Sequence, residues 1–209
     1  MAGRLLTSTA REYAGLAATY DNRWRAYIRD SVRETTDRTD LAPTQKILDL
    51  GTGTGALLEA LLARDPTLCA TGVDPSPEML EQAKAKLPDS VELVAAPARN
   101  LPFQDDEFDA IVSSSSLHFW TDREAGLKEA HRVLKPGGCL VLTDWCGNDP
   151  IMRIRDGYLR LTGNHHPSLT QGQLEDVLTA AGFDIRRIDR YRIAWNWALM
   201  TALASKPNA

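Results

Sequence analysis

The 209-residue sequence predicts an α/β fold built on a doubly wound, mostly parallel sheet, and three observations support this. Between residues 46 and 145, short apolar runs alternate with segments of helical periodicity, which is the pattern of parallel strands joined by right-handed helical crossovers. The first apolar run leads into a turn with three alternating glycines, and a helical pattern follows it directly. Hydrophobic residues make up 43% of the chain, enough for one sizeable core, so we expect residues 1–209 to form a single domain.

The predicted elements follow one another in a regular order. Apolar side chains between Trp24 and Val32 recur at the spacing of an amphipathic helix, which predicts a helix over residues 21–38. Gly182 is placed to end a later helix as a C-terminal cap. In chain order we then expect strand 46–50, helix 54–64, strand 69–74, helix 76–86, strands 90–95 and 107–113, helix 123–134, strand 138–144, helices 151–161 and 170–181, and strands 183–189 and 197–204.

The net charge of −4 is unevenly distributed along the chain. Residues 47–150 carry 8 basic and 17 acidic side chains, whereas residues 1–46 carry 8 and 6, and residues 151–209 carry 8 and 5. An acidic middle segment disfavours a nucleic-acid partner and attracts a cationic ligand. We therefore expect a small-molecule partner and no nucleic acid.

Membrane insertion, secretion and a metal site are not expected. No run of 18 or more apolar residues occurs, and the first residues lack the apolar core and cleavage site of a signal peptide, so we expect a cytoplasmic protein, either monomer or homodimer. The three cysteines, Cys69, Cys139 and Cys146, lack the spacing of metal ligands and are odd in number. We expect them to be reduced, buried thiols.

Residues 47–58, with the sequence ILDLGTGTGALL, are typical of a nucleotide-type cofactor site. Glycine permits tight turning, and without Cβ its backbone N–H groups can approach a ligand at a helix N-terminus. Asp74, at the end of the next predicted strand, can accept hydrogen bonds from both hydroxyls of a ribose. NAD-binding proteins share these features, so the motif alone leaves the cofactor open.

Four segments in order carry a resemblance that is more specific. They are ILDLGTGTGALL (47–58), GVDPSPEMLEQA (72–83), ARNLPFQDDEFDAIVSSSSLHFWTD (98–122) and HRVLKPGGCLVLTDW (131–145). Together they resemble the class I S-adenosyl-L-methionine (SAM) dependent methyltransferases of the methyltransferase-11 type, similar to ubiquinone/menaquinone-biosynthesis methyltransferases. The resemblance implies a Rossmann-like, seven-stranded sheet whose last strand is antiparallel, and SAM as cofactor.

The resemblance also implies roles for individual residues in SAM binding. Asp49 and the backbone of the glycine turn would hold the methionine part, and a carboxylate there favours an ammonium group on physical grounds as well. Asp74 would hold the ribose, with Pro75 and Met79 near the adenine and residues 98–99 at its edge. The full set of expected cofactor residues is Asp49, Gly51, Thr52, Gly53, Gly55, Asp74, Pro75, Met79, Ala98, Arg99 and Ser114.

Methyl transfer is an in-line displacement that demands alignment and a dry pocket, and a hydroxyl or acidic carbon acceptor also needs a base. His118, His165 and His166 are the candidates for this base or for substrate contact. The resemblance implies a helical lid over residues 1–45, a SAM-binding core over 46–145, a substrate-pocket insertion over 146–168, and a closing helix with strands over 169–209. Aromatic side chains expected to wall the site of a small, partly apolar acceptor are Tyr13, Tyr20, Trp24, Trp120 and Trp145.

Two other functions stay open at this point. The glycine turn and Asp74 are equally compatible with an NAD-dependent oxidoreductase. A SAM-binding protein without catalysis is the second alternative, because the aspartate that the family usually places before the adenine loop is Pro97 here. Binding of SAM and NAD, followed by an assay for methyl transfer, separates the three.

Overall fold

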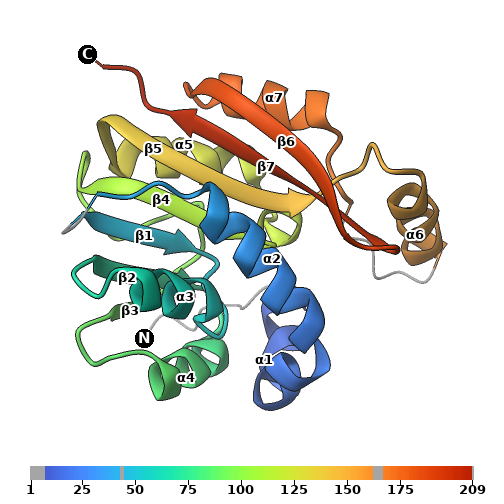
Figure 1. Ribbon diagram of the computed structural model, residues 1–209, viewed down its shortest axis with the longest axis horizontal. Helices are drawn as coiled ribbons and strands as arrows, with labels where there is room; N and C mark the ends of the chain where they lie inside the picture. Colours follow the sequence, from blue (N-terminus) through green and yellow to red (C-terminus); the bar gives the residue numbers. More distant parts are fainter. Residues whose placement is uncertain (1–7, 43–44, 162–166, 209) are drawn as a thin grey trace.

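A seven-stranded sheet forms the centre of the computed structural model (Figure 1), which describes residues 8–42, 45–161 and 167–208, with the backbone alone for residues 8–14. The strands are β1 (Lys46–Leu50), β2 (Cys69–Asp74), β3 (Glu92–Ala95), β4 (Phe108–Ser114), β5 (Leu134–Trp145), β6 (Asp184–Ala194) and β7 (Trp197–Ser205). The helices are α1 (Ser8–Arg23), α2 (Arg25–Arg38), α3 (Ala56–Arg64), α4 (Pro77–Lys86), the short 3-10 helix η1 (Leu117–Phe119), α5 (Arg123–Val133), α6 (Pro150–Leu161) and α7 (Gln171–Ala180).

The strand order is β3-β2-β1-β4-β5-β7-β6, and β7 alone runs antiparallel to its neighbours. This confirms the predicted doubly wound, Rossmann-like sheet with an antiparallel last strand. The strand order reverses between β1 and β4. The chain leaves the carboxyl ends of these two strands toward opposite faces of the sheet, and a crevice remains between the two ends.

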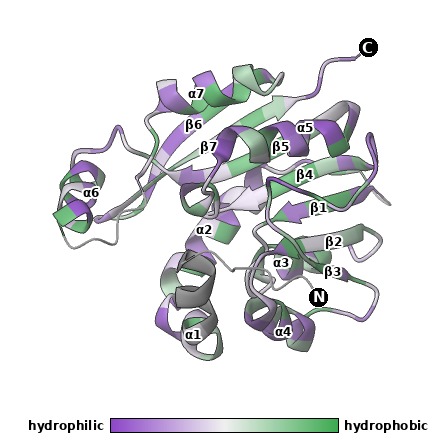
Figure 2. Ribbon diagram, turned by 180° about the vertical axis from the view of Figure 1, so that it is seen from behind, coloured by the Kyte–Doolittle hydropathy of each residue, from purple (hydrophilic) through white to green (hydrophobic). Residues whose placement is uncertain are grey.

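Helices cover both faces of the sheet, with α2 and α3 on one face and α5 and α7 on the other (Figures 1 and 2). Side chains alternate along each strand, so neighbouring residues such as Ile47 and Leu48 enter different apolar clusters. The α3 cluster includes Leu57, Leu58 and Leu61, whereas the α5 and α7 cluster includes Leu127 and Leu178. The two cores hold the sheet rigid beneath its functional edge.

Hydroxyl groups, not large apolar groups, form the buried side of α2. Its buried residues are Ser31, Thr35 and Thr36. The Thr35 hydroxyl lies 2.8 Å from the Thr143 hydroxyl of β5 and 3.3 Å from that of Ser114 in β4. Small side chains let the helix backbone approach the sheet closely, and the hydroxyl contacts satisfy the polar groups that this approach buries.

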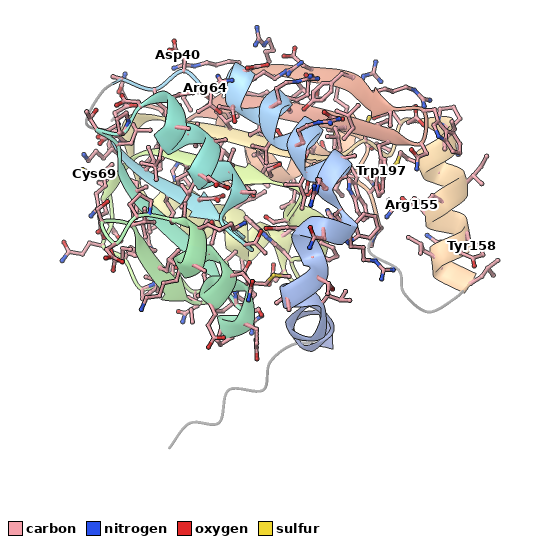
Figure 3. The ribbon with its side chains drawn as sticks, turned by 60° about the horizontal axis from the view of Figure 1, so that its bottom comes forward. Asp40, Arg64, Cys69, Arg155, Tyr158 and Trp197 are labelled. Carbon is pink, nitrogen blue, oxygen red and sulfur yellow. The ribbon has the colours of Figure 1, made fainter. Side chains whose placement is uncertain are left out.

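The structure departs from three sequence-based expectations. The predicted helix 21–38 is interrupted, because α1 ends at Arg23 and Trp24 adopts φ −111° and ψ 16° before α2 begins. Strand β5 starts at Leu134, inside the predicted helix 123–134, because Leu134 pairs with Phe108. The expectation of buried thiols is wrong for Cys69, which is exposed at the start of β2 (Figure 3).

We predict that Thr35→Val lowers the free energy of unfolding by about 1–2 kcal/mol, because valine keeps the shape but leaves buried hydroxyl partners under-satisfied. Urea unfolding measures this. The matched control is Thr19→Val in α1, where the hydroxyl is exposed and bonds only a local carbonyl. Equal effects of the two substitutions would contradict a structural role for the Thr35 contacts.

Candidate functional site

A cavity lies at the carboxyl ends of β1, β2 and β4, under the helices α1 and α2. Ten of the eleven residues predicted to bind the cofactor line it, from elements far apart in the sequence. The exception is Gly55, which directly precedes α3 and packs against α4 instead. The parallel sheet explains this convergence, since strand carboxyl ends meet at one edge.

The glycine turn after β1 needs glycine for backbone conformation and for space. Gly51, Gly53 and Gly55 have φ values of +76°, +53° and +81°, which L side chains rarely adopt. At Gly51 a Cβ atom would lie 2.4 Å from the Cβ of Ser116, whereas at Gly53 it would meet nothing within 4 Å. Gly51 therefore permits a close approach of β1 and β4, and Gly53 leaves the cavity open.

Three N–H groups of this turn, those of residues 51–53, bond to the end of β2. Those of Gly51 and Thr52 donate to the Val73 carbonyl at 2.8 and 2.9 Å, and that of Gly53 donates to the Asp74 carboxylate at 2.9 Å. The turn is thus fastened to the end of β2. Gly53 of the turn leaves space in the cavity, and the side chain of Asp49 lines the same cavity.

Asp49 is the most unusual group at the site. Its side chain is buried, and neither carboxylate oxygen has a hydrogen-bond partner among the described residues. Burial raises the pKa of Asp49 to about 7; the nearby hydroxyl of Thr52 limits the rise, and the charge of Asp74 adds to it. The buried hydroxyl of Thr52 also lacks a partner in the described chain. A buried carboxylate without a partner is costly unless a cation binds it, so this position fits an ammonium group.

Asp74 is a second carboxylate on the cavity wall. Its oxygens accept the N–H groups of Gly53 and of Ser76, at 2.9 and 2.8 Å, and burial raises its pKa to about 6. Each carboxylate oxygen can accept further hydrogen bonds. The position at the end of β2 therefore fits a pair of vicinal hydroxyls, as predicted for a ribose.

Aromatic and hydroxyl side chains close the opposite side of the cavity. Tyr20, Tyr27 and Trp120 line it, and burial raises the pKa of Tyr20 to about 12 and that of Tyr27 further. The Tyr27 hydroxyl lies 2.6 Å from the hydroxyl of Ser115, whose φ of +58° is unusual for a non-glycine residue. This strained contact joins α2 to the loop after β4.

His118, the first candidate base, lies behind the cavity wall. Its Nδ1 is 2.6 Å from a carboxylate oxygen of buried Asp144, and its ring stacks on Trp145 with centroids 3.5 Å apart. Its Nε2 is buried and has no partner among the described residues. Asp144 thus orients the ring through Nδ1. His118 itself is not among the cavity-lining residues, although its neighbour Phe119 is.

Several other predicted residues lie away from the cavity or outside the described structure. His165 and His166 fall outside the described residues, as does the side chain of Tyr13. Trp145 does not line the cavity but donates its Nε1–H to the Tyr27 hydroxyl at 2.9 Å. Trp24 packs edge-on against Trp197 and is not a lining residue.

Sequence reasoning missed part of the cavity wall. Ile28, Ser31 and Val32 of α2 line the cavity together with Ser116 and Thr121. The helical periodicity of α2 showed that one of its faces packs inward, but it could not show that the cavity lies beneath that face. The repeated serines of the segment SSSS (113–116) were the available signal for a polar cavity edge, because serines there have no apolar packing role.

The strand order, the glycine turn after β1 and the carboxylate at the end of β2 together define the class I SAM-dependent methyltransferase fold. Residues 48–142 match the family described as a methyltransferase domain. The same segments carried the resemblance drawn from the sequence, which the match confirms.

Comparison with known proteins gives relatives of the same class. The ubiquinone/menaquinone biosynthesis C-methyltransferase of Geotalea daltonii is 37% identical over 60% of this chain and 53% of its own length. The chloroplastic 2-methyl-6-phytyl-1,4-hydroquinone methyltransferase of Arabidopsis thaliana is 34% identical over 62% and 40%. The chain thus spans about half the length of the curated relatives it matches, or less.

A solved structure shares the fold along nearly the whole chain. It is that of the complex between the Haloferax volcanii Trm112 methyltransferase activator and a methyltransferase, in which the matching chain superposes with a TM-score of 0.83. The identity is 19%, over 94% of this chain and 98% of that chain. This likeness extends the fold assignment to the helices and strands outside residues 48–142.

We predict that Gly51→Ala costs roughly 3 kcal/mol or more of unfolding free energy, because a left-handed backbone and a clash with Ser116 act together. Gly53→Ala, the matched control, adds only the backbone cost of about 1–2 kcal/mol. Urea unfolding of both variants provides the measurement. A Gly51→Ala variant as stable as Gly53→Ala would contradict the close approach of β1 and β4.

We predict that Asp49→Asn stabilises the unliganded protein at pH 8 by about 2–4 kcal/mol and has little effect at pH 4. The pKa of Asp49 in the folded protein, about 7, lies above its ordinary value, so ionisation penalises the folded state. At low pH Asp49 is protonated in both states, and the wild-type fold keeps its full stability. As the pH rises from about 4 toward 7, the free energy of unfolding of the wild type falls. Unfolding titrations at several pH values test this, and a stability difference independent of pH would refute it.

Proposed function

We propose that the protein transfers a methyl group from SAM to a small, partly apolar acceptor with an aromatic ring of the quinol type. The unpartnered carboxylate of Asp49 at the foot of the cavity is the observation that carries the SAM assignment, since it fits the α-ammonium group of the cofactor. Asp74 would accept hydrogen bonds from the ribose hydroxyls. The missing side chain at Gly53 leaves room between the two carboxylates.

The chain's own residues would perform the tasks that methyl transfer needs. When bound, SAM supplies an electrophilic methyl group whose transfer removes a positive charge, so reactivity depends on alignment and exclusion of water. Tyr27, Ile28 and Val32 would close the cavity from above, which supports a lid role for the helices within residues 1–45. Phe119 and Trp120 would supply apolar walls on the other side.

The choice of acceptor rests on two supports. The names of the curated relatives indicate quinone and hydroquinone methylation, and the aromatic cavity wall of this chain is compatible with a ring of that kind. A quinol must lose a proton for carbon or oxygen to attack, so a base close to the cavity is needed. His118, oriented by Asp144, remains our proposal for this group, while the proposed insertion at residues 146–168 contributes no lining residue in its described part.

Calorimetry with SAM and with NAD tests the cofactor. We expect SAM to bind and NAD to bind far more weakly. The unpartnered carboxylate of Asp49 fits the ammonium group of SAM, and NAD has no ammonium group to place there. Tight NAD binding without SAM binding would overturn the proposal. Incubation with labelled SAM and a set of quinols, phenols, carboxylates and amines then tests the reaction. SAM binding without transfer to any acceptor would favour a non-catalytic SAM-binding protein.

We predict that Asp49→Asn weakens SAM binding by about 1.5–3 kcal/mol while stabilising the unliganded fold, since the lost contact is charge-assisted. In the wild type, affinity should rise as pH increases through about 7, where Asp49 ionises, and this rise should disappear in the variant. Asp74→Asn should also weaken binding, by about 1–3 kcal/mol. Unchanged dissociation constants in calorimetry would remove both residues from the site.

We predict that His118→Asn lowers turnover by about a hundredfold or more with SAM affinity nearly unchanged, because a positioned base contributes on that scale. Asparagine retains a donor toward Asp144, which limits damage to the fold. Steady-state kinetics across pH, together with SAM calorimetry, provide the measurement. Equal, small losses in turnover and affinity would instead make His118 a support of the cavity wall.

A further inference from the structure

Four large apolar side chains are exposed in the described part of the chain, and all of them come from α6 and the turn between β6 and β7. Ile154, Tyr158 and Leu161 are 74%, 66% and 87% exposed, and Trp195 is 78% exposed. Figure 1 shows α6 beside this hairpin turn, at the end of the molecule away from β3. Single exposed apolar residues need no explanation, but a gathering of the four in one region does.

The apolar residues of α6 form one outward stripe. Ile154, Tyr158 and Leu161 are spaced i, i+4 and i+7, which places them on the same side of the helix. The inward side is anchored, because Met152 is fully buried and the Arg155 guanidinium stacks over Trp145, 3.9 Å from the ring centroid. In Figure 3, Arg155 reaches back toward the body while Tyr158 lies on the outer side of the helix.

The charge beside this stripe is positive. Arg153 and Arg160 are exposed, lie seven residues apart on one side of α6, and form no ion pair within the described residues. The single carboxylate of α6, Asp156, accepts hydrogen bonds from the N–H and hydroxyl of Ser168, at 3.0 and 3.2 Å. The exposed arginines of α6 are therefore not neutralised, although the protein as a whole has a net charge of −4.

Trp195 is held next to the start of α6 by Arg192. The guanidinium of Arg192 donates to the Trp195 carbonyl at 2.6 Å and pairs with the carboxylate of Asp149. Asp149 in turn accepts the N–H of Ile151 in the first turn of the helix, at 2.9 Å. The hairpin turn is thus fastened to the start of the helix. We name the exposed apolar and basic residues of this region the α6 face: Arg153, Ile154, Tyr158, Arg160, Leu161 and Trp195.

We propose that the α6 face docks on the surface of a bilayer that contains anionic phospholipid. An amphipathic helix with an apolar stripe and arginines at its edge lies in the plane of such a surface, with the apolar side chains among the acyl boundary and the cations near the phosphates. Tryptophan and tyrosine favour the same interfacial depth. No described helix is long and apolar enough to cross a membrane.

A second copy of this chain fits the α6 face less well. A two-fold contact would bring the unpaired arginines of each copy close to those of the other, and like charges repel at a desolvated contact. No described residue of 146–168 lines the cavity, so the residues proposed for docking are not those proposed for SAM binding. Membrane docking does not depend on the proposed acceptor. For an acceptor with a lipid-soluble tail, docking would bring the protein to the bilayer that holds it.

Vesicle flotation with the full chain tests the proposal. We expect the protein to float with vesicles of phosphatidylglycerol and phosphatidylcholine in equal parts, to float less as salt is raised, and to stay with the soluble fraction when phosphatidylcholine is used alone. Trp195, if inserted, should shift the tryptophan emission to shorter wavelength on binding. Failure of the wild type to bind the anionic vesicles at low salt would overturn the proposal.

Two variants and one control assign the binding to the α6 face. Ile154→Ser/Tyr158→Ser/Leu161→Ser and Arg153→Gln/Arg160→Gln should each weaken vesicle binding by roughly tenfold or more. Lys84→Gln/Lys128→Gln, which removes the same charge from α4 and α5, should have little effect. Thermal melts and SAM calorimetry check that all variants fold, and neither readout depends on the acceptor.

Two further outcomes would overturn the membrane proposal, and a third bears on the proposed function. Vesicle binding by the triple-serine variant equal to that of the wild type would place the contact elsewhere. A dimer in sedimentation velocity that the triple-serine substitution abolishes, without vesicle binding by the wild type, would assign the α6 face to a second copy. Loss of SAM binding with vesicle binding retained would instead count against the proposed function alone.

Discussion

The attachment of the glycine turn to the end of β2 is the constraint on which the site depends. The Val73 carbonyl and the Asp74 carboxylate take the N–H groups of residues 51–53, so the turn cannot relax into a wider loop. Asp49 is thereby enclosed beneath it without a partner. The protein folds around a carboxylate that burial makes hard to ionise, and a cation bound there would offset this cost.

Hydroxyl contacts position the helix α2 on the sheet. A helix that buried leucines here would fill the space above β4 and β5, whereas Ser31 and Thr35 keep the helix close and satisfy its polar groups through hydroxyl contacts. Tyr27 continues this contact to Ser115 and Trp145. The roof of the cavity is therefore positioned by hydrogen bonds, which define its orientation more sharply than apolar packing alone.

Behind that roof, Trp145 connects two parts of the molecule with different tasks. His118 stacks on the Trp145 ring and Arg155 lies over it. The buried pair of His118 and Asp144 and the helix α6 therefore pack on the same aromatic side chain. This arrangement anchors the inward side of α6 and leaves its apolar and basic side outward. No described residue of α6 lines the cavity, so the α6 face and the cavity wall are made of different residues.

From residue 46 onward the sequence by itself determined the order of the main strands and helices, and ten of the eleven expected cofactor residues lie on the cavity wall. The order could be read because periodicity is local, whereas the cofactor residues followed from the resemblance to the methyltransferase-11 type. They meet in the structure because parallel strands bring their carboxyl ends to one edge. Only the tertiary structure decided that Trp145 and His118 lie behind the wall, that residues of α2 form the roof, and that Asp49 has no partner. These properties depend on how α2 is rotated on the sheet and on contacts between residues about a hundred positions apart, and neither is written in a local pattern.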